Sequence, residues 1–223
     1  MNINNISKNK AAFFDLDLTI TDTDSFRLFI KTSYFSSLSI MIFIPYIFFS
    51  GVLRKLRLIS LKRFKENALI GFKNKSMDEI RQIGDLFFEK HLKKTLRLKA
   101  VERIMDHLEK GYIVIIVSAS PNIYVHAVCL YLKCDGYICT RLDYKSSLFS
   151  GNFNGADCIG EEKRRRIKTF SKKQSIDLKK SWAYSDHEAD VPFLETVGYK
   201  VAVTPTLKLS KITRSRNWGI EEW

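Results

Sequence analysis

Two aspartates, Asp15 and Asp17, stand directly after an apolar run and are the residues of this sequence best suited to chemistry. The run, residues 11–14, is apolar at every position, which is typical of a strand covered on both faces. Residues two apart on a strand point the same way, so both carboxylates should project from its carboxyl end, where open α/β sheets bind ligands. Carboxylates this close repel each other unless a positive group lies beside them, and a divalent metal commonly provides it. A strand followed by an ordinary polar turn would give the same pattern.

A second pair of carboxylates, Asp186 and Asp190, follows another short strand that we predict over residues 182–184. Lys163 precedes this pair in the chain and lies near the start of a basic helix predicted over residues 161–173. On its own, such a helix would indicate a solvated or nucleic-acid-facing surface. Because the carboxyl ends of parallel strands meet at one edge of a sheet, we expect the two acidic pairs and the lysine to lie close together.

A stretch rich in hydroxyl groups, Ser118-Ala119-Ser120-Pro121, follows a β-branched run that predicts a buried strand over residues 112–117. Ser120 is suited to cap a helix whose first residue is Pro121. A strand, a short hydroxyl-bearing loop and a helix N-terminus together form a site for an anion. A simple helix cap would account for the same residues.

Strands alternate with helices along most of the chain. This alternation predicts a parallel sheet in a doubly wound α/β domain. The remaining expected elements are helices over residues 99–110 and 122–132, strands over 136–140 and 199–203, a hairpin over 142–155, and a polar tail that ends at Trp223.

One segment, residues 23–97, interrupts the alternation and is predicted to be an inserted helical cap. Residues 1–22 and 98–223 are then left to form the α/β core. Amphipathic helices are expected within the cap over residues 54–72 and 77–92.

The cap contains a hydrophobic segment, residues 32–53, that carries no charge and has basic residues on both flanks. Its length approaches the roughly 20 residues that a membrane-spanning helix needs. A single crossing would separate Asp15 from the later motifs, so a helical hairpin broken at Pro45, or a helix at the membrane interface, is the expected form of membrane contact. The basic flanks suit anionic headgroups. A hydrophobic helix buried within the cap of a soluble protein would also explain the segment.

The composition narrows the classes of partner. The 223 residues are enough for one domain with an insertion, and the net charge of +13 favours anionic partners such as phosphorylated metabolites, anionic lipid or nucleic acid. The four cysteines show no CxxC pair, which argues against zinc and favours reduced thiols in the cytoplasm. The polar first ten residues lack the apolar core of a secretory signal.

Taken in order, the motifs resemble those of the haloacid dehalogenase (HAD) superfamily and, within it, the phosphoserine-phosphatase-like IB subfamily. The matching pieces are Asp15-Leu16-Asp17-Leu18-Thr19, Ser118, Gly160-Glu161-Glu162-Lys163, Tyr184-Ser185-Asp186 and Asp190-Val191-Pro192. The last two pieces count as one motif. Each motif is weak alone, but four in this order and spacing are specific, and the resemblance extends over nearly the whole chain. Leu18 departs from the family pattern, which usually has glycine there to ease a strained backbone. We expect a leucine at this position to slow the chemistry or to reshape the pocket mouth.

The resemblance implies a phosphatase mechanism with two aspartates. Asp15 would attack phosphorus and form an aspartyl-phosphate, and Asp17 would protonate the leaving oxygen and later deprotonate water. The resemblance also implies Mg²⁺ as cofactor, held by Asp15, Asp186 and the main-chain carbonyl of Asp17.

The same resemblance implies how the phosphoryl group is held. Ser118, Ala119 and Lys163 would bind its oxygens. Asp190 would lie behind them and orient Lys163 or a metal-bound water.

The hydrophobic cap is similar to that of the C-type phosphatidylglycerophosphatases of bacteria. The sequence therefore suggests a Mg²⁺-dependent phosphomonoesterase acting on a lipid-linked or otherwise hydrophobic phosphate at the cytoplasmic face of the inner membrane. The alternatives are a soluble phosphatase of the phosphoserine type, a phosphotransferase, and a catalytically inactive basic binding protein. Nucleic acid is disfavoured as a partner, because aromatic residues are not interleaved with the basic run. The sequence does not indicate whether the protein is a monomer or an oligomer.

Overall fold

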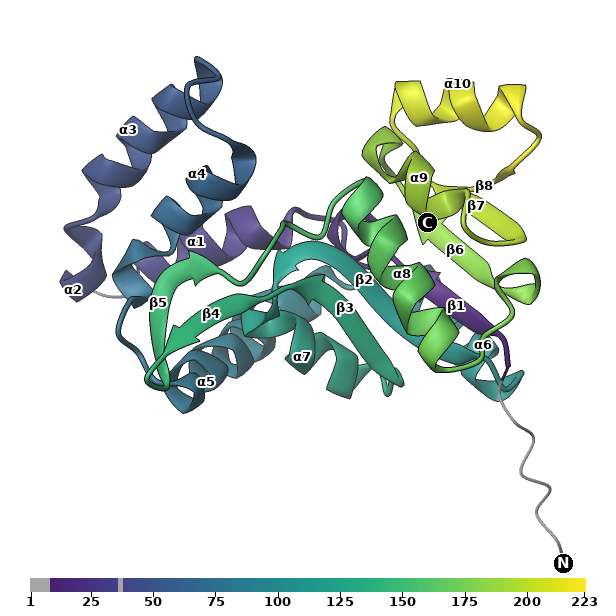
Figure 1. The fold of residues 1–223 in the computed structure, drawn as a ribbon, viewed down its shortest axis with the longest axis horizontal. Helices are drawn as coiled ribbons and strands as arrows, with labels where there is room; N and C mark the ends of the chain where they lie inside the picture. The colour runs from purple at the N-terminus through teal and green to yellow at the C-terminus, as the bar shows by residue number, and fades with distance from the viewer. Residues whose placement is uncertain (1–8, 36–37) are drawn as a thin grey trace, which may run out of the picture.

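The structure of the protein, a computed structural model, describes residues 9–35 and 38–223, so most of the polar N-terminal stretch lies outside the described residues. Six parallel strands form a central sheet with helices on both faces (Figure 1). Their order across the sheet is β3 (Gly136–Thr140), β2 (Ile113–Pro121), β1 (Ala11–Phe14), β6 (Trp182–Ser185), β7 (Tyr199–Val203) and β8 (Gly219–Glu221). The predicted doubly wound α/β fold is confirmed.

The central strand β1 is buried on both faces, which is why its sequence is apolar at every position. Ala12 and Phe14 belong to one hydrophobic cluster, and Ala11 and Phe13 belong to a second cluster on the opposite face. A strand in this position can end in carboxylates only at its carboxyl end, where the sheet opens to a cavity.

Helices cover the two faces of the sheet separately. The first cluster includes residues of α6 (Leu98–Glu109) and α7 (Asn122–Tyr131). The second includes residues of α8 (Glu161–Lys173), α9 (Val191–Leu194) and α10 (Leu207–Ser215). Short 3₁₀ turns, η5 (Leu178–Lys180) and η6 (Glu188–Asp190), precede β6 and α9, and the predicted hairpin forms as β4 (Leu142–Lys145) and β5 (Leu148–Phe153).

The prediction of a polar tail after β7 is wrong, because the C-terminal residues form α10 and the edge strand β8. Strand β8 pairs with β7 in parallel, with Val201 opposite Gly219. Trp223 then packs against the ring of Tyr184, with ring centroids 5.5 Å apart. These C-terminal residues have too few apolar side chains to form a core of their own. They are held in place by pairing with β7 and by packing against the sheet.

The chain between β1 and α6 is helical. Its elements are η1 (Leu16–Ile20), α1 (Ser25–Phe35), α2 (Leu38–Met41), α3 (Ile44–Lys55), α4 (Leu61–Ala68), η2 (Ile70–Phe72), α5 (Met77–Phe87), η3 (Phe88–Leu92) and η4 (Lys93–Thr95). The two segments that connect these helices to the sheet lie side by side. Thr21 and Leu96 form an antiparallel bridge, and the amide of Asp22 donates to the carbonyl of Thr95 at 2.9 Å.

The described residues of the hydrophobic segment, 32–35 and 38–53, belong to the end of α1, to α2 and to α3, and a break at residues 42–43 separates α2 from α3. The break precedes Pro45, which lies in the first turn of α3, where its missing amide hydrogen is not needed. Helix α3 projects from the body of the molecule and lies next to α4 (Figure 1). Over residues 9–35 and 38–223, we find no helix that combines the length and apolar character needed to cross a membrane.

The single helix predicted over residues 54–72 is wrong. Helix α3 ends at Lys55, and Arg57 has a left-handed backbone with a φ of 62°. Ser60 then caps α4 by accepting a hydrogen bond from the amide of Arg63. A serine cap and a left-handed residue stop the helix although the apolar spacing continues.

Candidate active site

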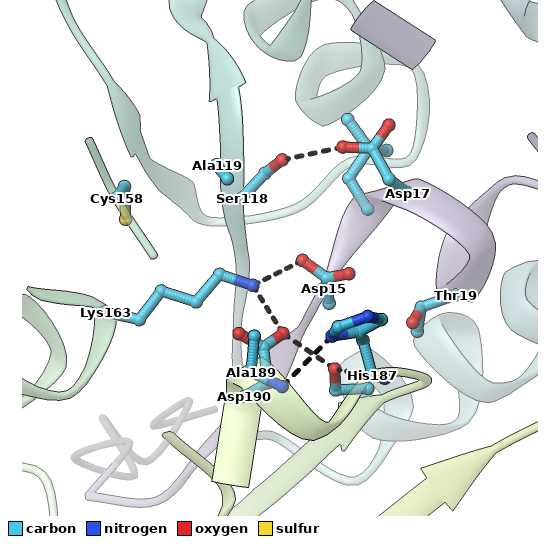
Figure 2. A network of polar contacts seen from close by, with 12 residues as sticks. Asp15, Asp17, Thr19, Ser118, Ala119, Cys158, Lys163, His187, Ala189 and Asp190 are labelled. Carbon is cyan, nitrogen blue, oxygen red and sulfur yellow. Dashed lines mark hydrogen bonds and ion pairs between the residues drawn. The ribbon is translucent and has the colours of Figure 1, made fainter. Parts of the chain in front are cut away.

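A lysine and two aspartates form a buried ion-pair cluster at the carboxyl end of β1 (Figure 2). Asp15 directly follows β1, and Lys163 lies in the first turn of α8. The Nζ atom of Lys163 is 2.6 Å from Asp15 Oδ1 and 2.6 Å from Asp190 Oδ2. Ser185, at the end of β6, donates its hydroxyl to the same oxygen of Asp190 at 2.7 Å. The structure therefore brings together three of the residues that the sequence singled out from distant parts of the chain.

This cluster carries more negative than positive charge. Burial raises the pKa of Asp15 well above its usual range, and the charges of Asp190, Asp17 and Asp186 raise it further, while Lys163 opposes the shift. Burial works against the ammonium of Lys163, but Asp15 and Asp190 outweigh it and raise the pKa of the lysine. Lys163 is therefore a permanent cation, and its one positive charge is shared by two carboxylates.

The second aspartate of the first motif, Asp17, is turned toward hydroxyl groups. Its Oδ1 accepts hydrogen bonds from the amide of Ser25 at 2.6 Å and from the Ser25 hydroxyl. Its Oδ2 accepts from Ser120 at 2.7 Å. The same oxygen accepts from Ser118 at 3.4 Å (Figure 2). Burial raises the pKa of Asp17, and the hydrogen bonds from Ser25 and Ser120 limit the rise. A carboxyl group with a raised pKa and fixed neighbours is suited to hold and release a proton.

The prediction that Ser120 caps a helix is wrong. Strand β2 continues through Pro121 with a register shift after Ser118, and α7 begins at Asn122 without a side-chain cap. The hydroxyl of Ser120 bonds to Asp17 instead. The residue that precedes the helix is Pro121 rather than Ser120, because α7 begins one residue later than predicted.

Leu18 lies on the turn η1, in the left-handed region of the backbone with a φ of 59°. This conformation is costly for a residue with a Cβ and explains why a glycine suits the position. The leucine side chain is partly exposed and lines the mouth of the cavity next to Asp17.

Asp186 lies at the end of β6 and lines the same cavity as Asp15. Its Oδ1 accepts a hydrogen bond from the hydroxyl of Thr19 at 3.3 Å. Burial raises the pKa of Asp186 to about 6, and the charge of Asp190 adds to the shift. The carboxylate is thus held where its charge is poorly compensated by the protein alone.

The oxygen-rich donor set fits a small hard cation. Asp15 and Asp186 are buried carboxylates with raised pKa values, and a divalent ion near them would offset the excess negative charge. Within the described part of the chain, no group of three or more His, Cys, Asp or Glu side chains is arranged to hold a metal. A magnesium shell here would therefore need the main-chain carbonyl of Asp17, water or substrate oxygens in addition to the two carboxylates.

A cavity of about 700 Å³ joins this polar cluster to the inserted helices. Its floor contains Asp15, Asp17, Lys163, Asp186 and Ala119. Its other wall is largely apolar with a basic rim, and it is formed by Phe26, Arg27, Ile30, Lys31, Phe35, Leu61, Phe64 and Lys65. The cavity therefore has a charged side at the sheet and a mainly apolar side at the inserted helices.

Sequence reasoning missed several residues of this site. Ser25 and Tyr124 belong to the hydroxyl network around Asp17, with the Ser25 hydroxyl 3.1 Å from both Ser120 Oγ and Tyr124 Oη. Lys65 of α4 also reaches the site, where it donates to the carbonyl of Ala119 at 2.9 Å. A serine at a helix start after an acidic turn was the one available signal for Ser25. No sequence pattern distinguished Lys65 from the other basic residues of its helix.

Comparison with known protein families shows which family the chain belongs to. A family model described as haloacid dehalogenase-like hydrolase matches residues 12–195. The chain belongs to the haloacid dehalogenase-like hydrolase family. The match includes both acidic pairs, Ser118 of β2 and Lys163, so the predicted family is confirmed.

Curated proteins are similar to the chain over most of its length. Phosphoserine phosphatase SerB1 of Mycobacterium tuberculosis is 25% identical over 222 residues, which cover 98% of this chain and 72% of that protein. The inhibition of morphological differentiation protein of Streptomyces azureus is 26% identical over 217 residues, covering 94% of this chain and 77% of that protein.

Solved structures share the fold. A protein of unknown function from Bordetella pertussis aligns with a TM-score of 0.85 at 21% identity, covering 96% of this chain and 98% of that one. A phospho-aspartyl intermediate analogue of phosphoserine phosphatase aligns with a TM-score of 0.65 at 18% identity, covering 96% and 93% of the two chains. These structures support the fold. The family match and the phosphatase among the relatives support a HAD-type hydrolase of phosphoric monoesters, as the sequence predicts.

Proposed function

We propose that this HAD-family phosphatase hydrolyses phosphomonoesters through an aspartyl-phosphate on Asp15, with Mg²⁺ as its cofactor. One observation carries the proposal. Asp15 is bonded to the ammonium of Lys163 at the floor of a cavity, and the second carboxyl group, Asp17, lines the same cavity. Phosphoryl transfer needs a nucleophile, a positive charge beside it and a separate proton donor, and Asp15, Lys163 and Asp17 are suited to these three roles.

In the first step, a carboxylate oxygen of Asp15 attacks phosphorus, and the bond between phosphorus and the ester oxygen breaks. The proton of Asp17 passes to that leaving oxygen, which departs as an alcohol. Burial supports this role, because the raised pKa of Asp17 favours the protonated form before the attack. Lys163 and the hydroxyl of Ser118 hold phosphoryl oxygens as charge moves onto them.

In the second step, Asp17 takes a proton from water, and the water oxygen attacks the phosphorus of the aspartyl-phosphate. The bond from phosphorus to Asp15 breaks, and inorganic phosphate and the free carboxylate are released. An alcohol in place of water would make the same chain a phosphotransferase. Asp190 positions the ammonium of Lys163 in both steps through its 2.6 Å contact.

Mg²⁺ would be held by Asp15, Asp186 and the main-chain carbonyl of Asp17. When bound, it neutralises charge between the carboxylates and the phosphoryl group and thereby lets two anions approach each other. The raised pKa of Asp186, about 6, is the observation in favour of a cation there.

We propose a substrate with a hydrophobic part, because the wall of the cavity opposite the carboxylates is lined by aromatic and aliphatic side chains. In this proposal the helices of residues 23–97 form a cap that selects the substrate, and residues 1–22 and 98–223 form the catalytic core. A small polar substrate of the phosphoserine type is the alternative, and the basic rim at Arg27 and Lys31 favours it if these residues pair with a second anionic group.

The test uses purified wild type, Asp15→Asn and a control variant, Asp22→Asn, whose side chain is exposed. Phosphate release is measured with Mg²⁺ and with EDTA, on a lipid phosphate, a long-chain alkyl phosphate and phosphoserine. We expect turnover in the wild type and the control, a loss of at least a thousandfold in Asp15→Asn, and a loss on adding EDTA. Full activity in Asp15→Asn would refute the nucleophile, and a preference for phosphoserine would refute the hydrophobic substrate.

We also propose that α3 and its flanks bring the protein to an anionic membrane surface, which for this chain would be the cytoplasmic face of the inner membrane. In α3, Ser50 is the buried residue, and the sequence from Ser25 to Lys65 has eight lysines and arginines but no aspartate or glutamate. We call residues 42–58 the arm. Its exposed apolar side chains are Ile42, Tyr46, Phe48, Phe49, Val52, Leu56 and Leu58. Apolar side chains with a basic surround suit insertion into anionic headgroups.

Sedimentation with vesicles tests this second proposal. The arm variant carries Phe48→Ser and Phe49→Ser, and Leu207→Ser on α10, which is 85% exposed, is the matched control. We expect wild type and control to sediment with vesicles rich in phosphatidylglycerol but not with phosphatidylcholine vesicles, and the arm variant to stay in the supernatant. Equal sedimentation of the arm variant and the control would contradict the proposal.

A further inference from the structure

Lys65 is a buried cation that the proposed mechanism does not use. It lies on α4, and its side chain is 9% exposed. Its Nζ atom donates to the main-chain carbonyl of Ala119 at 2.9 Å and lies 3.5 Å from Asp157 Oδ2. That oxygen is itself buried and has no hydrogen-bond partner among the described residues. An ammonium taken out of water in this way is stable only when its position is well defined by such partners.

The partners of Lys65 belong to a small polar network behind residues Ser118–Ser120, the proposed phosphate-binding stretch. Thr140, at the end of β3, is fully buried, and its hydroxyl lies 2.9 Å from the Ala119 carbonyl and 3.3 Å from Asp157 Oδ1. A hydroxyl group has one hydrogen to donate, so Thr140 can serve only one of these two acceptors at a time. When Thr140 donates to Asp157, Lys65 is the donor that remains for the carbonyl of Ala119.

The carbonyl of Ala119 and the amide of Ser120 belong to one peptide unit. In a trans peptide these two groups point in opposite directions, so fixing the carbonyl also fixes the amide. The amide of Ser120 donates to the hydroxyl oxygen of Ser118 at 2.9 Å, and the hydroxyl of Ser120 donates to Asp17 at 2.7 Å. A cation from an inserted helix thus acts, through one peptide plane, on the two serines that face the reacting groups.

We infer that Lys65 is a positioning residue that couples the inserted helix α4 to the phosphate-binding stretch. With α4 in place, Lys65 holds the peptide of Ala119 so that the hydroxyls of Ser118 and Ser120 are aimed at the phosphoryl group and Asp17. When α4 moves away, the peptide loses this donor and the serines lose their alignment. The phosphate-binding stretch is then complete only while the helices cover the cavity. This inference rests on the proposed phosphatase function.

The contact could instead serve substrate binding, since Lys65 also lines the cavity. The two roles differ in kinetics. A residue that binds the far part of the substrate changes KM, whereas a residue that aligns the serines for phosphoryl transfer changes kcat. The coupling with Thr140 is a further distinction, because both side chains act on one carbonyl.

The experiment compares Lys65→Met, which keeps the length of the side chain but removes the donor, with Lys65→Arg, which keeps a donor. Lys62→Met, on the same helix and 38% exposed, is the matched control. Kinetics are measured on the best substrate, and deuterium exchange is followed by mass spectrometry on the peptide that contains Ser118–Ser120. Urea unfolding shows which variants are folded, and Thr140→Val provides a second perturbation of the same carbonyl if Lys65→Met does not fold.

We expect Lys65→Met to lower kcat at least tenfold with KM within threefold of wild type, Lys65→Arg to restore part of the loss, and Lys62→Met to behave as wild type. Lys65→Met and Thr140→Val combined should lose less than the product of their separate effects. A higher KM with unchanged kcat, or a kcat as high as in Lys62→Met, would overturn the inference. If the wild type hydrolyses no phosphomonoester, the proposed function fails, and exchange alone decides: faster exchange in Lys65→Met supports the coupling, and unchanged exchange overturns it.

Discussion

Replacing Asp186 with asparagine should stabilise the metal-free protein while removing its response to magnesium. The pKa of Asp186 is raised from 3.8 to about 6, chiefly by burial. This difference of about 2 pKa units corresponds to about 3 kcal/mol at 1.36 kcal/mol per unit. Because the folded state holds the proton more tightly, the contribution is present below pH 4 and is lost as the pH rises through 6. At pH 7.5 without metal, the wild type therefore bears this cost and the neutral asparagine does not.

The assay is urea unfolding followed by tryptophan fluorescence at pH 7.5, first in EDTA and then in Mg²⁺. In EDTA, Asp186→Asn should exceed the wild type by about 2–3 kcal/mol in the free energy of unfolding, since the oxygen of asparagine can still accept the Thr19 hydrogen bond. Adding Mg²⁺ should stabilise the wild type through binding to the folded state and leave the variant unchanged. Asp190→Asn is the matched control and should destabilise in both conditions, because Asp190 pairs with the buried Lys163.

Two results would refute this reasoning. If Asp186→Asn were less stable than the wild type in EDTA, the carboxylate would not be held at a cost by burial. If the variant gained as much stability from Mg²⁺ as the wild type, Asp186 would not be a ligand of the ion.

Three further predictions concern stability. Leu18→Gly should raise the free energy of unfolding by about 0.5–1 kcal/mol by relieving the left-handed backbone, measured by urea unfolding against Leu18→Ala, which keeps the strain; an equal gain in both would contradict it. Burial lowers the pKa of His107 to about 4, so stability that is present above pH 6.5 should fall by about 3 kcal/mol as the pH drops to 4. His107→Gln should flatten the plot of urea midpoint against pH between pH 4 and 6.5. A plot identical to that of the wild type would show that protonation of His107 does not cause the loss. Gly84→Ala should destabilise by about 2 kcal/mol or more, because its Cβ would lie 1.8 Å from the carbonyl oxygen of Ile123; an unchanged melting temperature would show that α5 and α7 are not packed this closely.

The sheet and the helices around it were predictable because their apolar patterns are strong. Strand β3, helix α8 and strand β7 have the predicted bounds. The C-terminal strand β8 could not be predicted, because a three-residue edge strand depends on its neighbour rather than on its own pattern. The break between α3 and α4 was also missed, since one left-handed residue and one serine cap decide it.

At the candidate site, the sequence could identify the residue types but not all of the contacts. Asp15, Lys163 and Asp190 were predictable as a group, because each stands at the end of a strand or the start of a helix in a parallel sheet. Their catalytic roles stay predictions. Ser25 and Lys65 were not predictable, because a serine at a helix start and a lysine in a basic helix are common. Only tertiary packing brings Ser25 to Asp17 and Lys65 to the carbonyl of Ala119.

The antiparallel bridge between Thr21 and Leu96 lets changes in the inserted helices occur independently of changes in the sheet. The chain leaves the core at Thr21 and returns beside it at Leu96. Residues can therefore be inserted into or replaced within the helices between them without altering the register of any strand. The amphipathic arm around α3 could therefore have been acquired as a unit, leaving the carboxylates where they were. Grafting another helical insert between Thr21 and Leu96 should give a chimera with the same sheet and a different choice of ligand.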